Sequence, residues 1–236
     1  MVKKIRISLL LFLVPISIGF AQQEKDSLIN NLSEIKITKT TEKSKRYSIP
    51  VETMFGHRQV NYLSILNMKL GNSERFGYFS VITVATPYNN TNQPNELIIS
   101  NALTYKISNK LFATIGPQYH FIKGIVPTAG LQFLSVNSKW LFVLSTGIAF
   151  ATNTSFQNVG IAEFKPRISK SLKLYTRVQG IYNYKLKNAI HERSLLYFRS
   201  GITFKKTSLG LGFNIDFYGS GKISRENIGV FIHQIL

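Results

Sequence analysis

The sequence predicts an all-β protein, an antiparallel up-and-down transmembrane β-barrel of about 10 to 12 strands. Three observations predict this fold class. Apolar and polar residues alternate with a period of two, compact turn signals separate the alternating segments, and the chain opens with an export signal. The chain also has no cysteine. Because an exported protein without disulfides needs a large core or a closed sheet for stability, this absence agrees with a barrel.

Residues 1–21 have the order of residues found in a secretory signal peptide. Three basic residues precede an apolar run over residues 7–18, and small residues lead to Ala21. The run has about 12 apolar residues, whereas a membrane-spanning helix needs about 20, so an uncleaved anchor is the weaker alternative. We expect cleavage after Ala21 and export through the Sec pathway. Every later apolar run is interrupted within a few residues, which excludes a helical membrane protein.

Residues 22–48 are polar and charged, and they predict a periplasmic lead-in to a barrel over residues 49–236. Within this lead-in, residues 32–38 resemble the short segment that precedes the plug domain in TonB-dependent transporters. No plug domain follows, and the alternative is a linker with a brief extended stretch.

The clearest strand signal lies between Thr207 and Tyr218. Five apolar residues, beginning with Leu209, fall on one face, and small or polar residues fall on the other. A helix does not place residues in this way, so the pattern indicates a strand with one apolar face. Residues 111–121, 172–182 and 196–205 repeat the pattern. It is less regular over residues 97–107, 131–136 and 140–150.

The strand count follows from the turn signals. About eleven strands are visible between Arg58 and Leu236, and bacterial barrels of one chain use even numbers. Twelve strands result if residues 47–55 supply the first strand, and ten result if one weak strand is wrong.

Loop lengths favour twelve strands. The longest polar connection, residues 86–96, should be extracellular, because periplasmic turns are short. Counting onward, the connections over residues 184–192 and 219–226 fall on the same side, and Leu236 ends in the periplasm. Counting backward, an additional strand is needed before Arg58.

A secreted sandwich or a lipocalin-like barrel is the alternative fold, since its strands also alternate. A membrane barrel is favoured because the face that is not apolar is rich in Gly, Ser, Thr, Asn and Gln, and because aromatic residues recur near strand ends. The aromatic residues near strand ends are Phe76, Tyr78, Tyr105, Tyr119, Phe121, Trp140, Phe150, Tyr182, Tyr197, Phe204, Phe217 and Phe231.

Two prolines, Pro117 and Pro127, fall within predicted strands, so we expect them near a rim or at bulges.

Three features of the sequence carry a resemblance to a known group of proteins: the signal ending at Ala21 and Gln22, the hairpins rich in Lys and Asn, and the closing strand over residues 227–232. In these features the chain resembles small outer-membrane β-barrel proteins of Bacteroidota. The resemblance implies a location in the cell outer membrane and contact with outer-membrane lipids and lipopolysaccharide. It also implies folding by the barrel assembly machinery.

The protein is strongly basic, with 29 Lys and Arg against 11 Asp and Glu. Cleavage of the signal removes three basic residues and no acidic residue, which leaves 26 against 11 and a formal charge of +15. A charge this large favours an anionic neighbour, such as nucleic acid, lipid headgroups or an anionic solute. Because the chain is exported, we expect no nucleic-acid partner.

Several charged residues fall on the face predicted to line the lumen. They are Lys106, Lys173, Arg177, Arg199 and Lys205, against the acidic residues Asp216 and Glu163. The basic excess would concentrate anions, so one hypothesis is a mild anion preference set by Lys173, Arg177 and Arg199. In the alternative interpretation these residues pair with the acids and fill the lumen.

No residue pattern in the sequence predicts a catalytic, metal or cofactor site. The histidines His57, His120, His191 and His233 are far apart and lack the spacing of metal ligands on one strand. Three hypotheses follow. The first is a narrow passive pore for small anionic or polar solutes, and the second is a closed structural or partner-binding barrel that binds through residues 86–96 and 184–192. The third, a lipid-modifying enzyme that uses His120, is the weakest, and we predict no enzyme.

Overall fold

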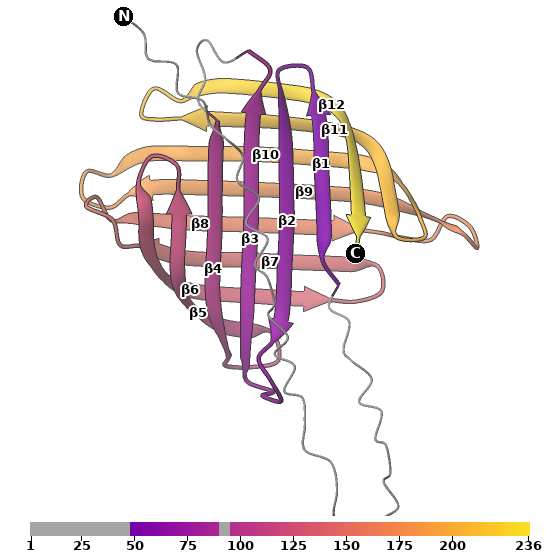
Figure 1. Cartoon of the computed structure of the whole chain (residues 1–236), viewed down its shortest axis with the longest axis horizontal. Helices are drawn as coiled ribbons and strands as arrows, with labels where there is room; N and C mark the ends of the chain where they lie inside the picture. The colour runs from indigo at the N-terminus through magenta and orange to yellow at the C-terminus, as the bar shows by residue number, and fades with distance from the viewer. Residues whose placement is uncertain (1–47, 90–94) are drawn as a thin grey trace, which may run out of the picture. The chain divides into compact units, whose positions relative to one another are not determined.

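The computed structural model describes residues 48–89 and 95–236, and this part of the chain is a closed, twelve-stranded antiparallel barrel (Figure 1). The predicted fold class is therefore confirmed. The strands are β1 (Pro50–Gly56), β2 (Gln59–Lys69), β3 (Phe76–Pro87), β4 (Glu96–Lys106), β5 (Leu111–His120), β6 (Gly124–Val136), β7 (Trp140–Ala149), β8 (Ser155–Phe164), β9 (Leu172–Lys185), β10 (Ile190–Phe204), β11 (Thr207–Tyr218) and β12 (Ile223–Ile235). No helix in these two described ranges is long and apolar enough to cross a membrane.

Each strand pairs with the next along the chain, and β1 pairs with β12 to close the sheet. Twelve is thus the strand number, and the short strand β1 is the one that the loop count required. Pro50 lies opposite Ile235, so both ends of the barrel segment meet at one end of the barrel. We call this end the terminal end and the opposite end the loop end. The predicted signal peptide, and the predicted lead-in except Ser48, lie outside the described residues.

The side chains of the barrel have the reverse of the usual soluble arrangement. Apolar residues such as Leu211, which is 68% exposed, and Ile115, which is 64% exposed, point outward. Asn214 and Arg199 point inward and are at most 1% exposed. Because successive residues of a strand face opposite sides, the alternation read from residues 207–218 produces this arrangement, and that prediction is confirmed.

The sheet folds back on itself at two places. In Figure 1 strands β2–β4 cross β7–β10, which lie behind them. The two layers join where β6 pairs with β7 and where β12 pairs with β1, and each join has two glycines opposite each other. These are Gly130 with Gly147 and Gly56 with Gly229. A Cβ at Gly229 would lie 1.9 Å from the Phe55 carbonyl oxygen, so only glycine allows the backbones to approach this closely.

Replacing Gly229 by alanine is expected to destabilise the barrel by about 1–3 kcal/mol, because the added methyl group displaces backbone rather than a flexible side chain. Gly160→Ala is the matched control. Gly160 is also in a strand, and a Cβ there meets no atom within 4 Å. Urea unfolding of both variants in lipid vesicles measures the difference. Equal unfolding midpoints would show that the close approach at Gly229 has no energetic importance.

The two strand prolines occupy positions where the sheet tolerates a missing N–H. Pro117 and Pro127 lie opposite each other near the turn between β5 and β6. Pro127 also lies beyond the end of β7, where its carbonyl accepts from the Phe150 N–H. Pairing of β5 with β4 is interrupted beside Pro117, between the pairs Ser100 with Gln118 and Leu103 with Ile115. The expectation that these prolines lie near a rim or an irregularity is confirmed.

The strands extend further into the predicted loops than the sequence pattern indicated. The connections that were expected over residues 86–96, 184–192 and 219–226 are only residues 88–95, 186–189 and 219–222, and all three lie at the loop end. The terminal end has a connection of similar length at residues 165–171, so long loops do not gather at one end. The alternation of apolar and polar residues stops before the strands end, because residues near the rims of the barrel need no apolar outer face.

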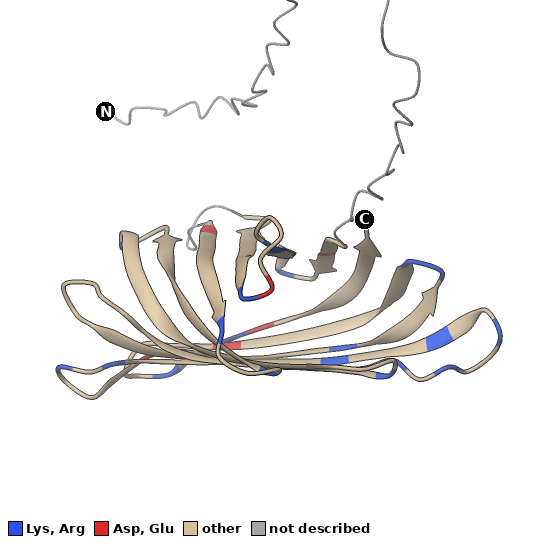
Figure 2. Ribbon diagram, turned by 90° about the horizontal axis from the view of Figure 1, so that it is seen from below, with Lys and Arg blue, Asp and Glu red and all other residues tan. Residues whose placement is uncertain are grey.

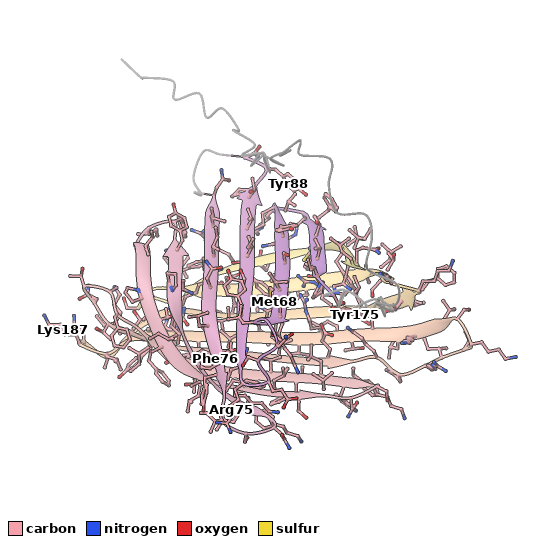
Figure 3. All side chains as sticks on the ribbon, turned by 60° about the horizontal axis from the view of Figure 1, so that its bottom comes forward. Met68, Arg75, Phe76, Tyr88, Tyr175 and Lys187 are labelled. Carbon is pink, nitrogen blue, oxygen red and sulfur yellow. The ribbon has the colours of Figure 1, made fainter. Side chains whose placement is uncertain are left out.

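Aromatic residues at strand ends follow the prediction in part. Figure 3 shows Phe76 and Tyr88 near opposite ends of β3. At the terminal end the rings of Trp140 and Phe164 lie 4.2 Å apart between their centroids. Tyr105, Tyr119, Phe150, Tyr182 and Phe204 are also exposed at or near strand ends. Phe231 and Tyr197 are corrections, because Phe231 points inward and is 2% exposed, and Tyr197 points inward from the middle of β10.

Candidate functional site

A buried ion-pair cluster joins β1 to β9 and β10, which are not neighbours of β1 in the sheet. One carboxylate oxygen of Glu52 accepts hydrogen bonds from Arg177 and Arg199, each over 2.8 Å. Arg199 also donates to the Asn214 side chain over 2.6 Å. We call these four residues the mid-barrel cluster. The charged groups are at most 4% exposed, so they depend on one another rather than on water for stabilisation.

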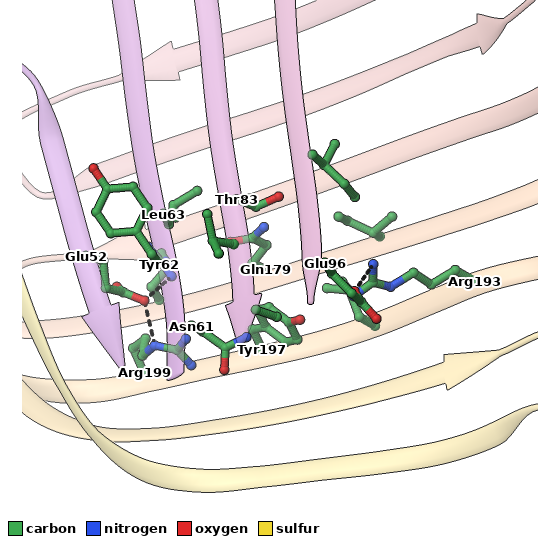
Figure 4. A pocket seen from close by; sticks show the side chains of 16 residues that line it. Glu52, Asn61, Tyr62, Leu63, Thr83, Glu96, Gln179, Arg193, Tyr197 and Arg199 are labelled. Carbon is green, nitrogen blue, oxygen red and sulfur yellow. Dashed lines mark hydrogen bonds and ion pairs between the residues drawn. The ribbon is translucent and has the colours of Figure 1, made fainter. Parts of the chain in front are cut away.

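A second cluster crosses the lumen near the loop end. Arg193 on β10 lies 2.9 Å from one carboxylate oxygen of Glu96 on β4, and Tyr218 on β11 donates to the other oxygen over 2.8 Å. Arg193 also lies 2.6 Å from Asp216, to which Tyr197 donates over 3.0 Å. We call these five residues the loop-end cluster. Since β4 and β10 belong to opposite layers, this cluster connects the two walls of the barrel (Figure 4).

Further polar contacts reinforce the same end. Glu192 forms an ion pair with Lys123 from the turn between β5 and β6, and it accepts from Ser155 over 2.9 Å. Deeper in the barrel, Gln157 on β8 donates to Gln118 on β5 over 3.1 Å. These bonds also join strands that are not neighbours, so the loop end of the interior is obstructed by polar side chains.

Side chains at the terminal end form a mixed aromatic and polar group. Tyr175 is fully buried, and its ring lies 5.4 Å from that of Phe231 and 5.2 Å from that of His233. Glu163 is 7% exposed and forms an ion pair with Lys165. The prediction that Glu163 points inward is therefore confirmed.

Besides Glu163, six residues were predicted to line the lumen, and the structure brings three of them into the mid-barrel and loop-end clusters and leaves three outside. Arg177 and Arg199 lie in the mid-barrel cluster, and Asp216 lies in the loop-end cluster. Lys106 and Lys173 are on the inward face but at the terminal ends of β4 and β9, and Lys173 is exposed. They are therefore rim residues, and a role in lining the pore stays a prediction.

Lys205 is a correction. It was expected on the inward face, but β10 ends at Phe204, and Lys205 lies in the turn with a φ of 53°. Its ammonium group lies 5.3 Å from the centroid of the Phe204 ring, which is exposed outside the barrel. The alternation of inward and outward residues stops where the turn begins, so counting by two beyond Phe204 misplaced this side chain.

The buried charges are nearly balanced among the described residues. Each buried arginine of the two clusters has a carboxylate partner, and Glu52 serves two of them. The excess of positive charge lies instead on the turns. At the terminal end the turns include one acidic residue, Glu74, and the basic residues Arg75, Lys110, Lys139, Lys165, Arg167, Lys170, Lys205 and Lys206. Figure 2 shows Lys and Arg on the hairpin turns.

Three charged residues of the clusters were not singled out from the sequence: Glu52, Glu96 and Arg193. Glu96 and Arg193 lie within or next to a predicted loop, and Glu52 lies in the short first strand, where too few residues show period-two alternation. The small number of acidic residues in the sequence could have identified the two glutamates. The chain has 11 against 29 basic residues, so an acid on the inward face of a strand is a strong candidate for a buried ion pair.

The histidines do not form a metal site, and no cluster of metal-ligating side chains occurs within residues 48–89 and 95–236. His120 is the last residue of β5, and it accepts from the Ile122 backbone N–H over 3.2 Å in the turn that follows. His191 lies 3.0 Å from the Ser194 hydroxyl and 2.7 Å from the Gly219 carbonyl oxygen. The second contact joins the start of β10 to the turn after β11, and Gly219 offers only a carbonyl oxygen where a catalytic triad would have a carboxylate.

The interior contains several cavities. One of about 360 Å³ lies at the terminal end, and one of about 210 Å³ adjoins it, since both are lined by Leu63, Phe79 and Ile161. A cavity of about 730 Å³ lies at the loop end. Between the two clusters only about 60 Å³ is open (Figure 4). Glu96 and Arg193 line both the small cavity and the loop-end cavity, so the loop-end cluster stands between them.

Comparisons with known proteins give no family. No protein-family model matches the sequence, and no curated protein matches it. Among solved structures, the NanC porin is similar, with 10% identity, a TM-score of 0.47 and coverage of 81% of this chain and all of the porin. An outer-membrane channel from Pseudomonas putida F1 has 9% identity, a TM-score of 0.47 and coverage of 80% and 95%. LpxR from Salmonella typhimurium has 6% identity, a TM-score of 0.42 and coverage of 79% and 99%. All three TM-scores are below 0.5, so the assignment of function depends on the geometry of this barrel.

Proposed function

We propose that this chain is an outer-membrane β-barrel that forms a narrow passive passage for small solutes, constricted at the loop-end cluster. One observation carries the proposal. Apolar side chains cover the outside of a closed sheet, while charged groups such as Arg199 and Asp216 are buried inside it. A closed sheet has no free edge, and an apolar exterior is stable in lipid, so this arrangement suits a barrel that crosses a membrane.

The terminal end would face the periplasm. An export signal delivers the chain from that side, and an even number of strands returns the C-terminus to it. Outer-membrane lipids and lipopolysaccharide would contact the apolar exterior. The solute would pass between the cavities through the gap beside Glu96 and Arg193, and its size would be limited there.

Passage can be measured by liposome swelling with protein recovered from the outer membrane of a Gram-negative host. The expected result is swelling with solutes of the size of glycine or a pentose, and little swelling with a trisaccharide. Protein-free liposomes, and liposomes with heat-unfolded protein, are the controls. Folded protein that inserts into the vesicles but swells them no faster than these controls would contradict a passage.

A closed, partner-binding barrel is the second candidate, because the loop-end cluster and the contact between Lys123 and Glu192 already span the interior. In that case the loop-end surface, including residues 186–189, would do the binding. The same swelling assay decides between the two candidates, since a closed barrel gives no swelling while still inserting into the vesicles.

A further inference from the structure

Part of the interior lining, contributed by both layers of the sheet, is apolar, which is unusual for a membrane barrel. Leu63 and Ile65 on β2, Phe79 on β3, Val143 on β7 and Ile161 on β8 all point inward. The interior of a membrane barrel is typically polar, because water fills it. These side chains are only partly buried, so they do not simply pack against one another as a solid core.

The apolar residues surround connected space. The five side chains line both the 360 Å³ cavity at the terminal end and the adjoining 210 Å³ cavity. We call these two cavities together the chamber. Binding sites for small molecules typically have volumes of about 300–1,000 Å³ and are lined mainly by apolar side chains with a few polar groups, and the chamber has this character.

The chamber lining also includes polar groups without partners, most of them on β9. Among the described residues, Arg177 Nε, His233 Nδ1, Gln179 Oε1 and Asn183 Oδ1 are buried and have no hydrogen-bond partner. Arg177 and His233 line the cavity at the terminal end, and Gln179 and Asn183 line the deeper one. Because an unsatisfied buried polar group costs about 1–3 kcal/mol, these atoms favour a bound molecule or ordered water.

The mouth of the chamber is basic. Lys165 lines the cavity at the terminal end and stands beside Glu163, with which it pairs. Glu163 and Glu52 are the acidic groups in this lining, and both have cationic partners. The surrounding turns contribute a strong excess of positive charge. An anionic group is therefore favoured at the mouth and an apolar group further inside.

We propose that the chamber binds a single-chain amphiphile with an anionic head. The apolar chain would lie along Phe79, Val143 and Ile161, and the head would lie near Arg177 and Lys165 at the terminal end. This inference rests on the proposed function, because it names the class of solute that would use the passage.

The test uses the protein in phospholipid nanodiscs and measures displacement of a fluorescent fatty acid. Dodecanoate is expected to displace the fluorescent probe at much lower concentration than acetate, which lacks the chain, or dodecyltrimethylammonium, which has the opposite charge. Nanodiscs without protein give the background from partition into lipid. Equal displacement by dodecanoate and the ammonium compound would overturn the anionic head, and no saturable binding above background would overturn the whole inference.

Variants locate the site. Ile161→Gln is expected to weaken dodecanoate binding by roughly tenfold, the effect of losing apolar contact in a binding pocket. Val143→Gln is a second variant in case Ile161→Gln does not fold, and folding is checked by the heat-modifiable mobility of the barrel. Lys165→Gln should weaken dodecanoate several-fold, whereas Lys187→Gln, in a turn at the loop end, should have no effect.

The outcomes separate this inference from the proposed function. If the protein swells liposomes but does not bind dodecanoate, the passage stands and the solute class is wrong. If it neither inserts nor swells liposomes, the proposed function itself fails. Unchanged binding in both Ile161→Gln and Val143→Gln would place the amphiphile outside the chamber and overturn the inference.

Discussion

Replacing Glu52 by glutamine is expected to destabilise the barrel by about 3–5 kcal/mol, the usual cost of removing one partner from a buried ion pair. Glu52 is the shared acceptor of Arg177 and Arg199, and all three side chains are at most 4% exposed. The variant leaves two buried guanidinium groups without a carboxylate. Urea unfolding of the protein in lipid vesicles measures the loss of stability.

Two further variants show whether the loss comes from the unpaired charge. Glu74→Gln, in an exposed turn at the terminal end, removes the same charge and should leave the unfolding midpoint unchanged. The triple variant Glu52→Leu, Arg177→Met, Arg199→Met should recover most of the stability, because apolar residues can replace a complete buried ion pair. If Glu52→Gln unfolds at the same urea concentration as Glu74→Gln, the mid-barrel cluster does not stabilise the fold.

Replacing Glu96 by alanine is expected to raise the single-channel conductance several-fold and to shift the selectivity toward anions. Glu96 is the only contact that the loop-end cluster makes with β4, so its loss separates the two walls at the constriction. Arg193 keeps Asp216 as a partner, so the variant should still fold. The positive charge of Arg193 would then be less compensated, which favours anions.

Glu226→Ala is the matched control for this measurement. Glu226 also lies near the loop end and also pairs with an arginine, Arg58, but both side chains are substantially exposed. The control removes the same charge without altering the interior, so its conductance should equal that of the natural protein. Equal conductance of Glu96→Ala and Glu226→Ala would show that the loop-end cluster is not the constriction.

The fold followed from the sequence wherever only one face of a strand is apolar. In β11 the inward residues are small or polar and the outward ones are apolar, so the faces were assigned correctly. The alternation was weak over residues 97–107, 131–136 and 140–150, and the chamber explains this. Val143 on β7 lines the chamber while its neighbour Leu144 is exposed outside, so both faces are apolar and period two disappears.

The site could be predicted only in part. The inward positions of Arg177, Arg199 and Asp216 followed from counting by two along single strands. The partners of these residues could not be predicted in this way. Glu52, for example, contacts Arg177 only after the sheet closes, because the two residues are 125 positions apart in the sequence. For Arg177, Arg199 and Asp216 the structure agrees with the alternative interpretation, in which charged lumen residues pair with one another. Lys205 was misplaced because the register of a strand says nothing about a side chain in the turn beyond it.

The most direct test of the account is the environment of four consecutive residues in β7. The protein has no cysteine, so single cysteines at residues 142, 143, 144 and 145 can be labelled with a fluorophore in protein reconstituted into vesicles. Labels at Phe142 and Leu144 should be quenched by nitroxide lipids, because these side chains point outward. Labels at Val143 and Ser145 should respond to a water-soluble quencher instead, because these side chains line the chamber. Alternation of this kind would establish an apolar exterior in lipid around a hollow interior. Quenching by lipid at Val143 and Ser145, or no alternation at all, would contradict it.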